Sequence, residues 1–89
     1  MFVYDIIDVE AAIEVIKAGI YKTRAEAGAA GDSGKASMHA GLQLEKMVQF
    51  KAMIASLKER KDPPTEIVIS VTERFYFTGA LKGPKRMLV

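Results

Sequence analysis

The strongest pattern in the chain is a helical repeat of apolar residues between Ala36 and Lys61. These residues recur at steps of three, four and seven positions, which places them on one face of an α-helix: Ala40, Leu44, Met47, Phe50, Ile54 and Leu57. The segment contains no proline, and Asp62 is followed by two prolines. Because the residue before a proline avoids the helical conformation, we predict one long central helix over residues 36–61, with a length of about 39 Å.

The beginning of the chain predicts a short strand followed by a helix. Phe2–Ile7 is apolar apart from Asp5 and has the composition of a strand. Asp8 is expected to cap the helix that follows, because its carboxylate can accept from the unpaired N–H groups of the first turn. We expect this helix to stop near Gly19. Its buried face repeats at steps of four, three and four: Val9, Ile13, Ile16 and Ile20.

Residues 23–36 combine a helix-capping pattern with small residues and glycines. Thr23 and Glu26 have capping-box spacing and predict a second short helix. The glycines after it predict a flexible linker near residues 28–35. The run from Ala29 to Ala36 approaches the phosphate-binding loop pattern, but it lacks the first glycine and the hydroxyl that would hold magnesium. We therefore expect only a candidate anion contact at Lys35, beside the backbone N–H groups that start the long helix.

After the double proline the apolar period changes from that of a helix to that of a strand. Ile67, Ile69 and Val71 alternate with Val68, Ser70 and Thr72, and Phe75 and Phe77 continue the same parity. Two interpretations stand here. The first is a single long strand over residues 66–78, and the second is a hairpin that turns at residues 72–74.

These elements predict a small single α+β domain over residues 1–89. It has an N-terminal strand, one or two short helices, one long central helix and a C-terminal two- or three-strand sheet. A turn at Gly83-Pro84 precedes the last short strand, over residues 86–89. The order of elements resembles that of the small ribonuclease toxins of the RelE/ParE type. The resemblance is limited to the order of the elements. No sequence motif matches, and this chain is less basic than such toxins.

The composition excludes several kinds of catalytic and metal-binding site. The 89 residues are 49% hydrophobic and 27% charged, with a net charge of +2, as in an ordinary globular protein. The absence of cysteine excludes thiolate nucleophiles, disulfides and cysteine-based metal sites, and the single histidine, His39, excludes a histidine-rich metal cage. With no nucleophile–base pair in view, we expect no enzyme and no catalytic, cofactor-binding or metal-ligating residue. Without a signal-peptide pattern or a long apolar run, we expect a cytoplasmic protein with no membrane partner.

Charge is distributed unevenly along the chain. Residues 1–34 hold six acidic and three basic groups, a net charge of −3, whereas residues 35–89 hold ten basic and five acidic groups, a net charge of +5. Lys82, Lys85 and Arg86 near the C-terminus are candidate nucleic-acid contacts through phosphates. The alternative is that these cations lie at a sheet margin, where they discourage edge-to-edge pairing.

A second apolar stripe lies outside the main face of the long helix, at Met38, Leu42 and Met53. A helix on a sheet needs only one apolar face, so this stripe needs a cover, either the first helix or another chain. With a marginal core in 89 residues, the stripe predicts a homo-oligomer, most simply a two-fold dimer.

The function expected from these patterns is that of a small non-enzymatic protein. It would act through homo-oligomerisation and through binding of another macromolecule, an unidentified protein partner. One alternative is a nucleic-acid-binding module that uses the basic C-terminal end. Another is an oligomeric small-ligand-binding protein with a pocket between subunits near Lys35 and His39.

Overall fold

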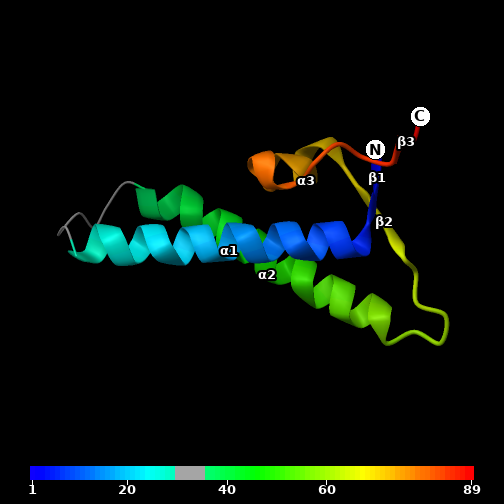
Figure 1. Ribbon diagram of the computed structural model, residues 1–89, viewed down its shortest axis with the longest axis horizontal. Coiled ribbons are helices and arrows are strands. Elements are labelled where there is room, and N and C mark those ends of the chain that lie inside the picture. Colours follow the sequence, from blue (N-terminus) through cyan, green and yellow to red (C-terminus); the bar gives the residue numbers. More distant parts are fainter. Residues whose placement is uncertain (30–35) are drawn as a thin grey trace.

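The computed structural model describes the backbone of residues 1–29 and 36–89, with side-chain detail for residues 1–22, 25 and 41–89. The order of elements confirms the predicted α+β class (Figure 1). Strand β1 (Phe2–Asp5) leads into helix α1 (Ile6–Ala29), and helix α2 (Ala36–Lys58) follows. The chain then forms strand β2 (Glu66–Ile69), helix α3 (Val71–Phe75), the 3₁₀ turn η1 (Thr78–Ala80) and strand β3 (Arg86–Met87).

The three strands form one antiparallel sheet with β1 in the centre, in the order β2-β1-β3. Phe2 lies opposite Ile69 on one side and Met87 on the other. The two ends of the chain therefore meet in one sheet, and the backbone N–H of Leu88 donates to the carbonyl of Met1 at 2.8 Å. The expected final strand over residues 86–89 is formed by Arg86 and Met87.

Helix α1 is one continuous helix of 24 residues, so the expected stop near Gly19 and the separate second helix were both wrong. A single glycine inside a helix costs only about 1 kcal/mol, and the burial of Ile16 and Ile20 on either side stabilises the continuous form. The expected N-cap at Asp8 was also wrong, because the helix already begins at Ile6, whose N–H donates to the carbonyl of Thr65 at 2.9 Å.

Helix α2 confirms the long central helix, except that it ends at Lys58 rather than at residue 61. Met47, Phe50 and Ile54 of the predicted stripe are buried, and Leu44 and Leu57 pack at the edge of the core. The linker expected near residues 28–35 falls mostly on residues 30–35, which lie outside the described part of the chain, while residues 28 and 29 belong to α1.

Neither interpretation of residues 66–78 was right. Strand β2 ends at Ile69, and Ser70 then caps helix α3 in a complete capping box with Glu73. The Glu73 N–H donates to Ser70 Oγ at 3.1 Å, and the Ser70 N–H donates to Glu73 Oε1 at 2.9 Å. These two bonds satisfy the unpaired donors of a helix start. Phe75 at the end of this helix and Phe77 just after it therefore lie in opposite environments, 72% and 0% exposed.

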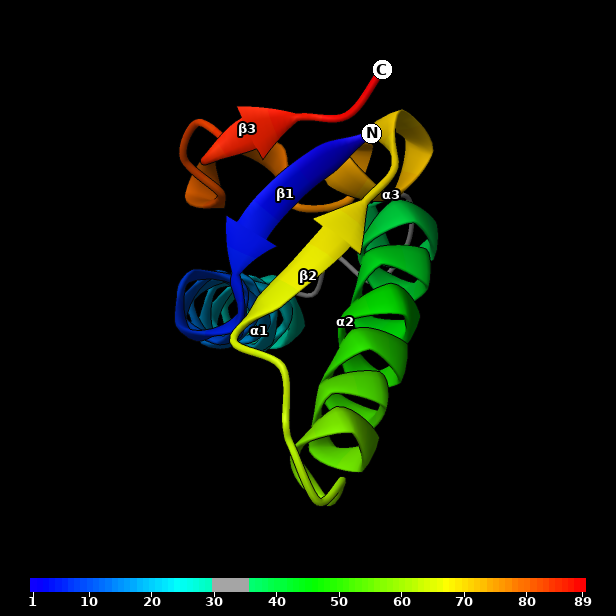
Figure 2. The same cartoon turned by 90° about the vertical axis from the view of Figure 1, so that its right-hand side faces the viewer.

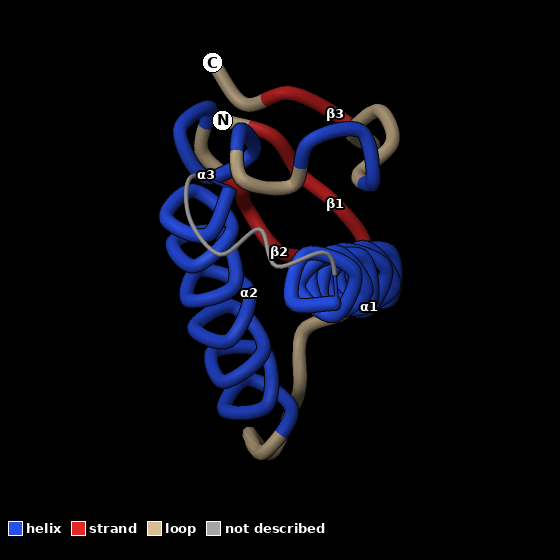
Figure 3. The backbone as a smooth tube through the Cα atoms, turned by 90° about the vertical axis from the view of Figure 1, so that its left-hand side faces the viewer, coloured by secondary structure: helices blue, strands red, loops and turns tan. Residues whose placement is uncertain are grey.

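The helices lie against one side of the sheet. Figure 2 shows α1 end-on beneath the strands and α2 beside β2. From the opposite end, Figure 3 shows α3 above α2, and the 3₁₀ turn η1 above α1. A continuous core fills the space between these elements: Phe2, Tyr4, Ile6, Val9, Ala12, Ile13, Ile16, Ile20, Met47, Phe50, Ile54, Ile67, Ile69, Phe77 and Leu81.

Candidate functional site

The predicted interface stripe is exposed on α2. Leu42 and Met53 are 43% and 41% exposed. Their separation along the helix is close to three full turns, about 16 Å, so they share one side of α2. Met38 lies outside the described side chains. Helix α1 packs on another side of α2, where Met47 and Ile54 are buried, and so it is not the cover for this stripe.

A shallow groove runs beside Met53, between α2 and α3. Its volume is about 230 Å³, and its lining is partly aromatic: Lys46, Gln49, Phe50, Met53, Thr72, Glu73 and Tyr76. Gln43 Nε2 donates to the carbonyl of Tyr76 at 2.6 Å, which ties α3 to α2. The ring of Phe75 lies 6.2 Å from that of Tyr76, edge to face, and extends the apolar surface outward.

We call this surface the α2–α3 face. It is defined by the exposed apolar residues Leu42, Met53, Val71 and Phe75. Leu42 precedes Lys46 of the groove by one helical turn, and Val71 precedes Phe75 by one turn of α3. The face is therefore made of exposed apolar residues from two helices that share the groove.

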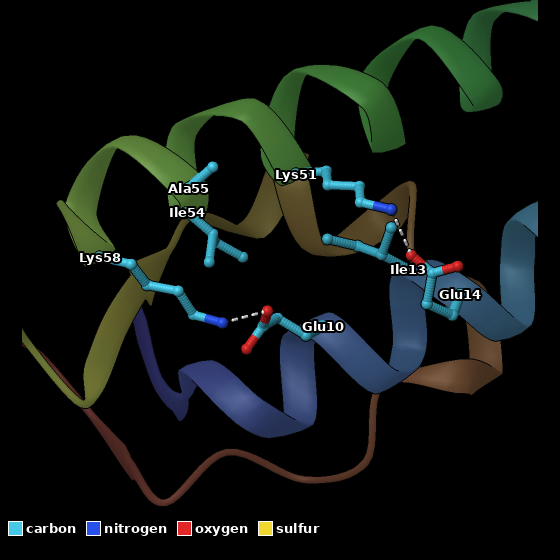
Figure 4. Close-up of a pocket in the computed structure, with 7 residues that line it drawn as sticks. All are labelled: Glu10, Ile13, Glu14, Lys51, Ile54, Ala55 and Lys58. Carbon is cyan, nitrogen blue, oxygen red and sulfur yellow. Dashed lines mark hydrogen bonds and ion pairs between the residues drawn. The ribbon is translucent and has the colours of Figure 1, made fainter.

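A second groove lies between α1 and α2, and two ion pairs cross it (Figure 4). Lys51 Nζ lies 2.9 Å from Glu14, and Lys58 Nζ lies 2.6 Å from Glu10. The hydrogen bond from Lys51 lowers the pKa of Glu14, and Lys17 lowers it further. The volume is only about 120 Å³. All four charged groups that line the groove are already paired, so it acts as a contact between helices rather than as a binding site.

The basic residues near the C-terminus lie beside acidic ones. Arg86 holds Glu66 through two hydrogen bonds of 3.2 and 3.0 Å, a bidentate geometry that fixes orientation as well as charge. Lys85 Nζ lies 3.1 Å from Asp5 and 3.0 Å from Glu66. The bonds from Arg86, followed by those from Lys85, lower the pKa of Glu66 to about 2.

These ion pairs bear on the candidate nucleic-acid contacts. Lys85 and Arg86 hold the β3 end of the chain to β1 and β2, and their charges are balanced by carboxylates. Lys82 forms no ion pair with any described group, and Lys35, the candidate anion contact, lies outside the described residues. Nucleic-acid binding by these cations stays a prediction, and the geometry assigns two of them a role within the fold.

A third cavity, of about 310 Å³, lies between α1 and the segment that follows η1. Its lining combines mostly small and apolar residues with one tyrosine and two charged side chains: Tyr4, Asp8, Ala11, Ala12, Val15, Ala80, Lys82 and Gly83. Tyr4 is 2% exposed, and its hydroxyl has no hydrogen-bond partner in the described part of the chain. Sequence reasoning missed this cavity, because its walls come from residues about 70 positions apart.

No group of three or more metal-ligating side chains converges among the described residues. None of the helices in this part of the chain has the length and apolar character needed to cross a membrane. Comparison with known protein families, with curated proteins and with solved structures finds no match to this chain.

Proposed function

We propose that this chain is a small non-enzymatic protein that works as a homodimer joined through the α2–α3 face. The dimer would bind a further protein partner, in the cytoplasmic location expected from the sequence. The observation that carries the proposal is the exposure of Leu42 and Met53 on the side of α2 that α1 leaves uncovered. Contiguous exposed apolar surface on a small protein is typical of an interaction site.

The shape of the molecule supports the same proposal. The radius of gyration is 14.8 Å, and the extents are 48 × 28 × 16 Å. A compact domain of this length has a radius of gyration of about 12 Å. The excess comes from the two long helices, which extend past the sheet, and the last buried residue among the described side chains of α1 is Ile20. An elongated monomer buries less apolar area per residue, and a dimer along α2 adds to that area.

Two-fold symmetry predicts the arrangement of the dimer. A two-fold axis pairs one patch with the same patch on the second copy. If two α2 helices pack antiparallel about this axis, Leu42 of one copy meets Met53 of the other. The axis then passes midway between them, at residues 47–48 along the helix, and Gln49, which is exposed and faces the same side, lies within half a turn of it. Methionine suits such a contact because its unbranched side chain adapts to irregular surfaces.

A separate stripe of exposed apolar residues, on α1, supports the binding of a further partner. Ile7, Ala11 and Val15 lie four residues apart on α1, and Ile7 and Val15 are 73% and 64% exposed. A spacing of four residues places all three on one side of the helix. This side of α1 is separate from the α2–α3 face, so a dimer would leave it accessible to another protein.

The test is the mass in solution, measured by light scattering, for the wild type and for two variants. The wild type is expected at twice the monomer mass of 9.7 kDa. The double variant Leu42→Glu and Met53→Glu is expected at the monomer mass, because it places charges in an apolar interface. Val48→Glu is the matched control, since Val48 is 51% exposed on another side of the same helix, and it should remain a dimer. A wild-type monomer at high micromolar concentration would refute the proposal.

A further inference from the structure

We propose that the cavity beside Tyr4 is a binding site for a small hydroxyl-bearing zwitterion of the amino-acid class. The first observation is the Tyr4 hydroxyl, which is buried without a hydrogen-bond partner in the described residues. Tyr4 lines the cavity and is 2% exposed. A buried hydroxyl carries a desolvation cost that only a hydrogen bond offsets. The hydroxyl is closed off from the cavity in the ligand-free structure, so a ligand that displaces the inner wall would supply that bond.

The second observation is a pair of opposite charges on the same cavity. Asp8 on α1 and Lys82 after η1 both line it and are both exposed, so they lie towards solvent, whereas Tyr4 lies on the inner side. They form no ion pair with each other or with any other described group. A ligand with an ammonium and a carboxylate group matches both charges at once, with the ammonium at Asp8 and the carboxylate at Lys82.

The remaining wall sets the size of the ligand. Ala11, Ala12, Ala80 and Gly83 are small, and they leave a volume of about 310 Å³. This volume lies at the low end of the range for small-molecule sites. With the charges at the mouth and the hydroxyl inside, a short side chain that carries a hydroxyl reaches Tyr4, while its methyl group contacts the alanines.

The test compares L-threonine with L-valine, which have the same shape and differ by a hydroxyl in place of a methyl group. Each is titrated to tens of millimolar into ¹⁵N-labelled protein, and the amide resonances are followed by NMR. L-threonine is expected to shift the amides around Asp8, Ala11 and Gly83 in a saturable way, and to bind about fivefold more tightly than L-valine.

Three variants locate the contacts. Tyr4→Phe removes only the hydroxyl and should abolish the preference for L-threonine. Lys82→Met should weaken both ligands about tenfold, and Lys61→Met, at another exposed lysine, should change neither. The absence of saturable shifts with L-threonine, or an unchanged preference in Tyr4→Phe, would overturn the proposal. The dimer variant Leu42→Glu and Met53→Glu should bind L-threonine as the wild type does, since the cavity lies away from the α2–α3 face.

Discussion

Asp5 and Glu66 lie directly opposite each other in the antiparallel register of β1 and β2. Two like charges in this position repel and destabilise the pairing of the strands. Lys85 compensates, because its ammonium lies 3.1 Å from Asp5 and 3.0 Å from Glu66. The C-terminal segment is therefore held beside β1 by these ion pairs as well as by the β1–β3 hydrogen bonds.

Removal of this bridge should destabilise the sheet. Lys85→Met leaves the two carboxylates facing each other, so its melting temperature should fall more than that of Lys82→Met, whose lysine has no ion pair among the described groups. Thermal unfolding followed by circular dichroism measures both. The difference should shrink at high salt, because exposed charges are screened. Equal melting temperatures at low salt would show that Lys85 does not bridge the strands.

The same cluster makes stability depend on pH. The hydrogen bonds from Arg86 and Lys85 lower the pKa of Glu66 from 4.5 to about 2. A carboxyl with a lowered pKa in the folded state stabilises the fold above its unfolded pKa, and this contribution is lost as the pH falls. The urea midpoint should therefore decrease between pH 4.5 and 2. Glu66→Gln should show a flatter decrease than Glu59→Gln, an exposed glutamate outside the described ion pairs.

Tyr4→Phe should stabilise the protein without ligand. The substitution keeps the ring in place and removes a buried hydroxyl that lacks a partner. We expect a gain of about 1 kcal/mol, which for a domain of this size corresponds to a rise of about 4–8 °C in melting temperature. Differential scanning calorimetry in ligand-free buffer measures the change. A lower melting temperature in Tyr4→Phe would show that the hydroxyl is hydrogen-bonded in the ligand-free protein.

Two phenylalanines two positions apart test the fold of residues 70–77. Phe77 is fully buried, and its ring lies 5.0 Å from that of Phe50, whereas Phe75 is 72% exposed. Phe77→Ala should cost about 3–5 kcal/mol of unfolding free energy, and Phe75→Ala should change it by less than about 0.5 kcal/mol in a monomeric background. Denaturant unfolding of both variants in the Leu42→Glu and Met53→Glu background gives the comparison. Similar costs for the two would indicate a strand, in which both side chains face the same way.

The patterns that depend on local periodicity could be predicted from the sequence. The stripe of Met47, Phe50 and Ile54 repeats at helical spacing and is buried, and the adjacent Leu42 and Met53 fall outside it and are exposed. The α3 helix was missed because the alternation from Ile67 continues through two phenylalanines. The signal that could have found it was the spacing of Ser70 and Glu73, which is that of a capping box.

The cavity beside Tyr4 could not be predicted in this way. It forms only when the segment from Ala80 to Gly83 lies over α1 near Asp8 and Ala11. No periodic pattern links these positions, which are brought together by the return of the chain to β1. The length of α1 was underestimated for a related reason, since the burial of Ile20 in the tertiary structure outweighs the local cost of Gly19.

The most direct test of the central claim uses the absence of cysteine from the chain. Gln49→Cys places a single thiol near the proposed two-fold axis, and Val48→Cys places one on another side of the same helix. Under mild oxidation at low micromolar concentration, Gln49→Cys should form a covalent dimer rapidly, because the two thiols lie within one helical turn of each other across the axis. Val48→Cys should remain largely monomeric on a non-reducing gel. Equal and slow cross-linking of the two variants would contradict a dimer built on the α2–α3 face.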